Sequence, residues 1–460
     1  MKKTLGGLHM KTNLTEGNVF KKLIFFSLPY LMSYFLQTLY GMADLFIIGQ
    51  YGSVADITAV SIGSQVMHML TVIIVGLAMG STVSIGRYVG AGNEHGAAKS
   101  VGNTITLFMV ISVFATFVLL LCAKPITVIM SVPSEAVGGT LDYLRICFIG
   151  IPFITAYNII SSVLRGMGDS KSPMYFIAVA CVVNIVLDFI FIGKMNIGTA
   201  GAALGTTLSQ TASVAAALIY IRRKNIGISV KAADFRPSKI TMSQILRVGI
   251  PVALQDGFIQ ISFVLITIFA NRRGLDDAAA VGIVEKIIGI FFLLPSSMLS
   301  AVSALAAQNL GAAKPARARR TLWYAIAVAM GFGLAVSVIT QFFAEDIVGI
   351  FGDDPTVRIL GGQYLRSYVF DCVFAGASFC FSGYFCALEK SEISFMHNVI
   401  SIVLVRIPVA YYASKTFADT LYPMGLASPL GSLLSAIICV AAYIHITKKQ
   451  LQLRFDTERA

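Results

Sequence analysis

Twelve apolar stretches alternate with short polar segments along the chain. They lie at about residues 20–48, 55–82, 100–123, 138–161, 172–193, 198–221, 244–270, 279–305, 321–344, 360–384, 394–414 and 425–446. Each is about 20 residues or longer, which is the length a helix needs to cross a bilayer, whereas barrel strands would be ~10 residues long and would alternate in polarity. The pattern therefore predicts twelve transmembrane helices.

The composition supports a membrane protein. Of the 460 residues, 56% are hydrophobic and 13% are charged, whereas a typical soluble domain has about 25% charged residues. The predicted fold class is thus an all-α membrane protein. The stretch from Phe20 is too long for the apolar part of a cleavable signal, so we interpret it as an uncleaved first span. The seven cysteines lie within or at the ends of apolar stretches, which suits packing rather than metal binding.

The distribution of basic residues predicts the orientation. The net charge is +12, and 25 of the 35 Lys and Arg residues fall on the side shared by the two termini. Cytoplasmic loops carry such an excess, so we expect a multi-pass cell-membrane protein with both termini in the cytoplasm. The charge is thereby explained by topology, and nucleic-acid binding is not expected. The longest polar loop, about 222–243, is too short for a soluble catalytic domain.

The two halves of the sequence repeat at an offset of about 221 residues. The matching positions are Pro29 with Pro251, Gly90 with Gly311, and the Tyr-Leu-Arg runs at 143–145 and 364–366. Because each half has six spans, both halves enter the membrane with the same orientation, which predicts two six-helix lobes related by a pseudo-twofold axis along the membrane normal. The predicted domains are an N-lobe at 1–221, a cytoplasmic linker at 222–243 and a C-lobe at 244–460 with a short cytoplasmic tail.

Two acidic residues of the first half lie deep in apolar stretches. Asp44 is in the first stretch and Asp188 in the fifth, neither with a Lys or Arg beside it. A carboxylate near the bilayer centre costs about 2.5–3.5 kcal/mol on insertion scales, and chains keep one where it works in a cavity or with partners. The alternative is a purely structural role, in which the acid only links helices by hydrogen bonds. Function is favoured because Asp44 aligns with Ile266 and Asp188 with Val409, so the acids are not part of the shared scaffold.

Polar residues near these acids complete a candidate cation site. Asn184 lies four residues before Asp188 and so shares its helical face. Thr206 follows small residues, from Gly201 onward, that let helices approach closely. Two carboxyls with an amide and a hydroxyl suit either a shared proton or a Na+ ion held by oxygen ligands.

Three further residues are candidates for a supporting role. Tyr143 and Asn158, both in the fourth stretch, would add a hydroxyl and an amide, although packing explains them equally well. Pro29 removes a backbone hydrogen bond from the first helix, which either lets it bend near Asp44 or only makes a static kink.

The second half carries acids of its own. Asp256, Glu285 and Asp371 lie in the seventh, eighth and tenth stretches, where they would bind an ion or form acidic walls for a cationic substrate. Lys286 follows Glu285 and would alternatively neutralise it. His397, near the start of the eleventh stretch, is expected at the membrane interface.

Motifs for nucleotide hydrolysis and for metal-dependent hydrolysis are missing from the sequence. It contains neither a Gly-x-x-x-x-Gly-Lys-[Ser/Thr] loop nor a His-Glu-x-x-His pair. We therefore expect no cofactor. Energy for transport would come from an ion gradient, with H+ or Na+ as the coupling ion, or from a separate subunit.

Six short segments together carry a resemblance to a known family. They lie at 43–50, 86–93, 164–170, 184–188, 201–206 and 307–312. Over nearly its whole length the chain resembles the multidrug and toxic compound extrusion (MATE) transporters. The resemblance implies drug efflux driven by inward H+ or Na+ flow, with an N-lobe cation site formed by Asp44, Asn184, Asp188 and Thr206. In the sodium-coupled branch it also implies a C-lobe site made by acids on helices seven and ten.

The second half departs from that family pattern. The usual glutamate position of helix seven holds Ile259, Asp256 lies about one turn earlier, and Asp371 is also displaced by about a turn. This departure favours coupling through the N-lobe, and by H+ more than by Na+.

The sequence therefore predicts a secondary active exporter of organic, often cationic, small molecules that works by alternating access in the lipid bilayer. A monomer is expected, and an enzyme is not. Two alternatives stay open. A flippase for lipid-linked saccharides of the same superfamily would need a basic cavity. A membrane-embedded enzyme would need a group of catalytic residues that the sequence does not display.

Overall fold

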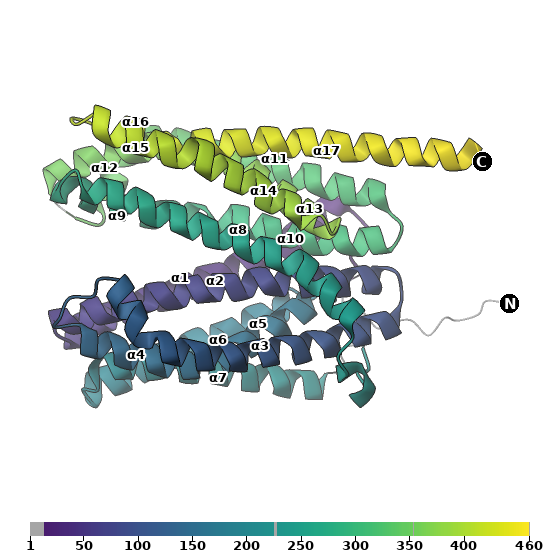
Figure 1. Cartoon of the computed structure of the whole chain (residues 1–460), viewed down its shortest axis with the longest axis horizontal. Coiled ribbons are helices and arrows are strands. Elements are labelled where there is room, and N and C mark those ends of the chain that lie inside the picture. Colours follow the sequence, from purple (N-terminus) through teal and green to yellow (C-terminus); the bar gives the residue numbers. More distant parts are fainter. Residues whose placement is uncertain (1–12, 225–227, 353, 460) are drawn as a thin grey trace. The chain divides into compact units, whose positions relative to one another are not determined.

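The computed structural model describes residues 13–224, 228–352 and 354–459, with side chains as far as residue 449. These residues form helices joined by short turns (Figure 1). The elements of the first half are α1 (Val19–Tyr51), α2 (Val54–Gly90), α3 (Glu94–Ile129), α4 (Val137–Ile149), α5 (Ile151–Gly166), α6 (Lys171–Asp188), η1 (Phe189–Lys194), α7 (Gly198–Arg223) and η2 (Ala232–Phe235). Those of the second half are α8 (Lys239–Asn271), α9 (Leu275–Phe291), α10 (Leu293–Gly311), α11 (Pro315–Gly349), α12 (Pro355–Tyr368), α13 (Asp371–Ala387), α14 (Ser391–Ser401), η3 (Ile402–Arg406), α15 (Ile407–Thr416), α16 (Tyr422–Gly425) and α17 (Ala427–Arg459).

The helices reproduce the predicted spans. In the described part of the chain, 10 helices are long and apolar enough to cross a membrane, and the number is 12 if each of two bent pairs is one span. The pairs are α4 with α5, bent by 47°, and α12 with α13, bent by 42°. Each predicted stretch falls inside one span, and the helices extend past the apolar residues at their ends.

Local sequence explains where several helices begin and break. Asn18 accepts a hydrogen bond from the Lys21 amide at 3.0 Å at the start of α1, and Asn93 accepts one from the Gly96 amide at 2.8 Å at the start of α3. Such caps satisfy backbone donors that have no partner within the helix and stabilise it by ~1 kcal/mol. The α4–α5 break falls at Gly150, just before Pro152, which has no backbone N–H to continue the preceding helix.

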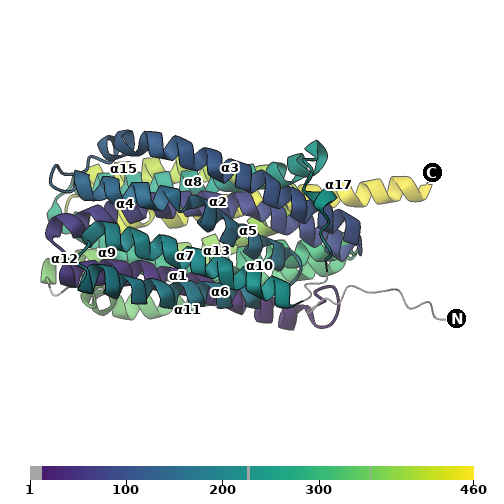
Figure 2. The ribbon, with the colours of Figure 1, turned by 90° about the horizontal axis from the view of Figure 1, so that it is seen from below.

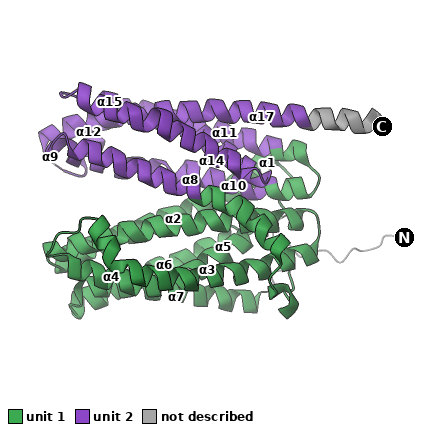
Figure 3. Cartoon of the chain, viewed as in Figure 1, with its two compact units in different colours: residues 1–253, 307–318 green, residues 254–306, 319–460 purple. Residues whose placement is uncertain are grey.

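The chain divides into two compact units (Figure 3). Unit 1 comprises residues 1–253 and 307–318, and unit 2 comprises residues 254–306 and 319–460. The division into an N-lobe, a linker and a C-lobe at 221 and 244 stays a prediction. Residues 1–12 of the predicted N-lobe and 225–227 of the predicted linker lie outside the described residues.

Close backbone contacts join the start of α8 and the end of α10 to unit 1. A side chain at Gly80 of α2 would collide with the carbonyl of Ile245, and one at Gly311 would collide with the carbonyl of Arg87. Gln308 is buried and donates from Nε2 to the Gly166 carbonyl at 2.8 Å. Glycine at these positions therefore lets helices from the second half pack tightly within unit 1.

The described part of the predicted linker packs on α3. Asn103 donates from Nδ2 to the Asp234 carbonyl at 3.1 Å, and its Oδ1 accepts from the Ser238 amide at 2.7 Å. Thr106 donates to the Phe235 carbonyl at 2.9 Å. This segment is therefore held by the first half and does not act as a loose tether.

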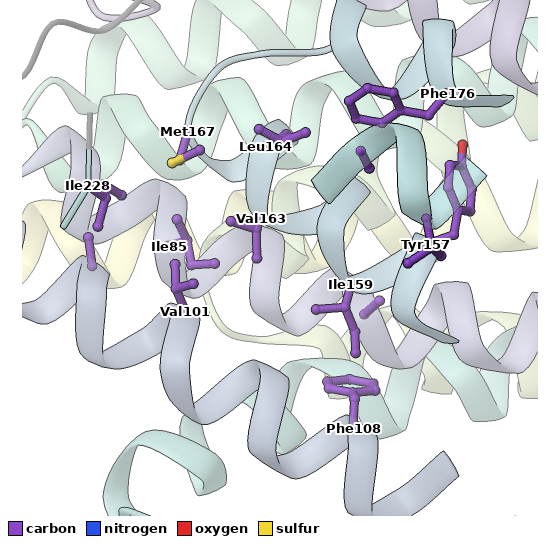
Figure 4. Packing of buried hydrophobic residues seen from close by; sticks show 14 of the residues in the cluster. Ile85, Val101, Phe108, Tyr157, Ile159, Val163, Leu164, Met167, Phe176 and Ile228 are labelled. Atoms are coloured by element: carbon purple, nitrogen blue, oxygen red, sulfur yellow. The ribbon is translucent and has the colours of Figure 1, made fainter. Parts of the chain in front are cut away.

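Unit 1 has a tightly packed interior, part of which is shown in Figure 4. Ile85 of α2, Val101 and Phe108 of α3, and Val163 of α5 are among its buried members. The long helices of unit 1 run along one common direction in both views (Figures 1 and 2). Because lipid is as apolar as these side chains, close packing and small residues hold such helices together more than the hydrophobic effect does. The result is a rigid support for the polar residues described next.

Candidate functional site

Asp44 lies on the buried face of α1. Its side chain is 3% exposed, and Ile47 and Ile48 share its face, while Met42 and Phe46 point outward. The apolar character of α1 surrounds this one acidic position, so the sequence correctly singled out Asp44 as an intramembrane carboxyl.

Asn184 and Asp188 lie one turn apart on α6, and both are fully buried. Both side chains lie close enough to the Asp44 carboxyl to interact with it. The structure therefore brings the two predicted acids and the amide together. α6 ends at Asp188 and continues as the π-helical turn η1. Single π-helical turns inside helices are frequent at functional sites, since they re-aim side chains locally.

Thr206 on α7 completes the predicted group. Its hydroxyl donates to Oδ2 of Asp44 at 3.2 Å, and the residue is 9% exposed. Gly205 beside it faces α6, where a Cβ would collide with Oδ1 of Asp188 and lie 3.6 Å from Nδ2 of Asn184. The small residues of α7 therefore do what the sequence predicted: they let α7 approach the acid closely.

The polar atoms of this group are poorly satisfied by the protein. Oδ1 of Asp44, both oxygens of Asp188 and both side-chain polar atoms of Asn184 are buried without a hydrogen-bond partner among the described residues. The ion pairs formed by described side chains, such as Arg273 with Asp277 at 2.8 Å, do not involve either acid. Buried charge without a partner costs several kcal/mol, so the group favours taking up a positive charge.

The chemistry of the ligands suits two kinds of positive charge. A proton placed between two neighbouring carboxyls removes their mutual repulsion. An alkali cation such as Na+ would be met by carboxylate, amide and hydroxyl oxygens, which are the hard ligands such ions prefer. The site residues thus fit either coupling ion.

The supporting candidates separate into different roles. Tyr143 is 1% exposed, interacts electrostatically with Asp44 and lies beside Thr206. It therefore borders the site. Gly63 of α2 makes room for the Tyr143 ring, because a Cβ there would lie 2.9 Å from Cε1. Asn158 instead donates from Nδ2 to the Ile154 carbonyl of its own helix at 2.8 Å. Pro29 is buried within α1, where Ser33 donates to its carbonyl at 2.7 Å.

Two neighbours were missed by the sequence reasoning. Tyr40 lies one turn before Asp44 on α1, and Gln210 lies one turn after Thr206 on α7. Tyr40 interacts with both Asp44 and Gln210, and Oε1 of Gln210 is buried without a partner among the described residues. Helical spacing of four residues from the predicted ligands was the signal that would have found them.

The acids of the second half do not form one group. Glu285 and Asp371 both lie near Arg406 and the paired rings of Tyr364 and Tyr368, whose centroids are 5.4 Å apart. Asp371 is 2% exposed, whereas Glu285 is only partly buried. The ion or substrate role predicted for these acids stays a prediction.

Asp256 lies elsewhere in unit 2. Its neighbour on α13 is Cys386, and Cys386 is 15 residues, or about 22 Å along a helix, from Asp371. Asp256 is therefore set apart from the pair formed by Glu285 and Asp371.

The interfacial depth expected for His397 stays a prediction, but its side chain faces protein. The residue is fully buried, and its ring nitrogens lie 3.0 Å from the Ser382 hydroxyl and 2.5 Å from the Ser435 hydroxyl. A neutral histidine can be buried between two hydroxyls because each ring nitrogen has a partner. Its position near the start of a span therefore did not imply contact with the membrane surface.

Comparison with known proteins defines the class. The MatE family profile matches residues 29–190 and again residues 251–412, so the same profile covers both halves at an offset of 222. The fold is that of solved MATE transporters: an outward-facing multidrug resistance MATE family transporter superposes with a TM-score of 0.89 at 23% identity, over 97% of this chain and 99% of that one. The twelve-helix fold class is thereby confirmed. The chain belongs to the MatE family.

Curated relatives span nearly the same length. The chain is 28% identical over 397 residues to the probable multidrug resistance protein YpnP of Bacillus subtilis (strain 168), covering 86% of this chain and 88% of the relative. It is 24% identical over 449 residues to the multidrug export protein MepA of Staphylococcus haemolyticus (strain JCSC1435), covering 97% and 96%. Family membership makes the chain a multi-pass membrane transporter and not an enzyme, which removes the membrane-embedded enzyme from the alternatives.

Proposed function

We propose that this chain is a secondary active exporter of organic, often cationic, compounds that takes up H+ or Na+ at Asp44 and Asp188 in exchange. The observation that carries the proposal is the buried pair of carboxyls on α1 and α6. Three of their four oxygens have no hydrogen-bond partner among the described residues. The names of the relatives, a multidrug resistance protein and a multidrug export protein, support the substrate class. The distribution of Lys and Arg supports cytoplasmic termini.

Exchange follows from the charge state of the pair. A bound cation neutralises the carboxyls and lowers the cost of keeping them buried, while its release leaves a charge that favours hydration. The loaded and unloaded sites therefore favour different surroundings for α1, and a ligand shifts such an equilibrium by its difference in affinity for the two states. Pro29 gives α1 a point without a backbone N–H, where a change of shape costs less.

H+ is the coupling ion that we favour. One proton shared by Asp44 and Asp188 satisfies both carboxyls at once, and Thr206 already supplies a hydrogen bond to Asp44. Na+ would instead require several oxygens to converge at about 2.4 Å, which asks more of Asn184 and Thr206.

Transport in proteoliposomes tests the proposal. A pH gradient and a Na+ gradient are imposed separately on the purified chain, and movement of an organic cation such as ethidium is followed. We expect one gradient to drive transport and Asp44→Asn to abolish it, while Asp142→Asn, which changes an exposed acid of α4, retains it. Wild-type transport by Asp44→Asn contradicts the proposed site. Movement of a lipid-linked saccharide, with no ion-driven movement of ethidium, identifies the flippase alternative instead.

A further inference from the structure

A buried arginine of unit 2 lies close to the position that corresponds to the cation site of unit 1. The register that aligns Asp188 with Val409 aligns Asn184 with Val405, so Arg406 is the next residue on the same helix. Asp44 aligns with Ile266, which is followed by Thr267. Where unit 1 has an acid and an amide, the corresponding segment of unit 2 therefore has a guanidinium.

Arg406 is enclosed by protein. It lies at the end of the π-helical turn η3, is 8% exposed, and donates from Nη2 to the Tyr368 hydroxyl at 3.0 Å. Its guanidinium carbon lies 4.5 Å from the centroid of the Phe263 ring. Gly431 of α17 permits this packing, because a Cβ there would lie 3.3 Å from Cβ of Arg406.

Two acids of unit 2 lie near enough to interact with this guanidinium, although neither forms an ion pair with it within 4.0 Å among the described residues. Oδ1 of Asp371 is buried without a hydrogen-bond partner among the described residues. Nε of Arg406 is likewise buried without one. The Thr267 hydroxyl donates to the Glu285 carboxyl, with Oγ1 at 3.4 Å from Oε1 and 3.3 Å from Oε2. Both acids interact electrostatically with Arg406. Lys286, which the sequence offered as the neutralising residue, is exposed.

Burial and electrostatics together indicate which charges offset each other. A guanidinium stays protonated at any physiological pH, so burying it requires an anion nearby. Asp371 is also the first residue of α13, where the helix dipole favours a negative charge. Glu285 is partly exposed and hydrogen-bonded, so it needs a compensating positive charge less than Asp371 does.

We propose that Arg406 is the resident cation of unit 2: it lies beside the counterpart of Asn184 and offsets the charges of Asp371 and Glu285, so that unit 2 takes up no exchangeable cation. The proposal rests on the proposed function only in treating the chain as a cation exchanger. It assigns a positioning and specificity role to Arg406 and predicts that exchange occurs in one half only.

Binding of ²²Na+ to purified protein tests this directly. The unit 1 site is first removed with Asp44→Asn and Asp188→Asn, so the outcome does not depend on whether those acids couple transport. In this background we expect no saturable ²²Na+ binding with Arg406 in place or with Arg406→Lys. We expect a gain of saturable binding with Arg406→Gln and its loss again when Glu285→Gln and Asp371→Asn are added.

Two results overturn the proposal. One is saturable binding with Arg406 intact that Glu285→Gln or Asp371→Asn removes. The other is folded Arg406→Gln protein that binds no Na+. If Arg406→Gln cannot be purified, its combination with Glu285→Gln and Asp371→Asn decides, since recovery of folded protein supports charge compensation and failure to recover it contradicts the proposal.

Discussion

The two halves of this chain show how a repeated scaffold can carry opposite charge arrangements. In unit 1, Asp44 and Asp188 are buried on α1 and α6 with oxygens that have no partner among the described residues. In unit 2, the corresponding part of the chain places Arg406 at the end of η3, bonded to Tyr368. A positive charge is absent from the described residues of the first site and is built into the second.

The comparison teaches that the repeat sets helix positions while single substitutions set the chemistry. Both halves have a π-helical turn in this span, although at different positions: η1 begins directly after Asp188, whereas η3 ends at Arg406. Both also bring a later helix close through glycine, at Gly205 in unit 1 and at Gly431 in unit 2. The predictions below change one side of the comparison at a time.

Removing the positive charge of unit 2 should have the largest effect on stability. Arg406→Met removes the positive charge near the buried Asp371, and leaving a buried charge uncompensated costs up to about 3–5 kcal/mol. The measurement is thermal unfolding in detergent, with Arg406→Lys as the matched control that keeps the charge. Equal melting temperatures for Met and Lys variants would show that the charge of Arg406 is not needed.

Filling the space beside Asp188 should have the next largest effect. In Gly205→Ala the new Cβ would collide with Oδ1 of Asp188, and overpacking of this kind costs about 1–3 kcal/mol. A loss of 1.4 kcal/mol in cation binding corresponds to about tenfold in affinity. We expect ion-driven efflux to fall by at least that factor.

Gly257→Ala is the matched control for this change. A Cβ at Gly257 of α8 would meet no atom within 4 Å, so transport should be kept. Equal activity of the two alanine variants would argue against a tightly enclosed Asp188.

Loss of the hydrogen bond to Asp44 should have an effect of the same order. Thr206→Val removes the donor that lies 3.2 Å from Oδ2 of Asp44, and hydrogen bonds to charged groups contribute about 1.5–3 kcal/mol. The concentration of coupling ion needed for half-maximal efflux should change by tenfold or more. Thr211→Val, which removes only a bond to the carbonyl of Thr207, should leave it unchanged; the same shift in both variants would make Thr206 a packing residue.

Asn158 should have the smallest effect. Its amide bonds to the Ile154 carbonyl of its own helix and not to the acids, and an ordinary hydrogen bond contributes about 0.5–1.5 kcal/mol. Asn158→Ala should therefore lower the melting temperature slightly and leave the ion dependence of efflux intact. A changed ion dependence would extend the site toward α5.

The sequence predicted the spans and the residues that the structure brings together around Asp44 because both depend on strong local signals. Apolar length defines a transmembrane helix, and an acid within such a helix, like Asp44, stands out by its cost. The i and i+4 spacing of Asn184 and Asp188 placed them on one face. Thr206 was identified through the neighbouring glycines, whose close contact with α6 the structure confirms.

What the sequence did not reveal depends on contacts between distant segments. Arg406 lies inside the predicted stretch 394–414, but its partners Tyr368 and Phe263 come from distant segments and are known only from the structure. The burial of His397 was missed because its two hydroxyl partners lie 15 and 38 residues away. Gln210 lies one turn after Thr206, a spacing that the sequence displays, but only the structure shows that its oxygen is buried near Tyr40.

Release of the coupling ion upon substrate binding tests the central claim most directly. Purified protein in weak buffer is titrated with an organic cation while proton release, or displacement of ²²Na+, is recorded. The account predicts release from the wild type and from Glu285→Gln with Asp371→Asn, but none from Asp44→Asn with Asp188→Asn. Release that persists without the two acids of unit 1, or that vanishes only when those of unit 2 are changed, would contradict it.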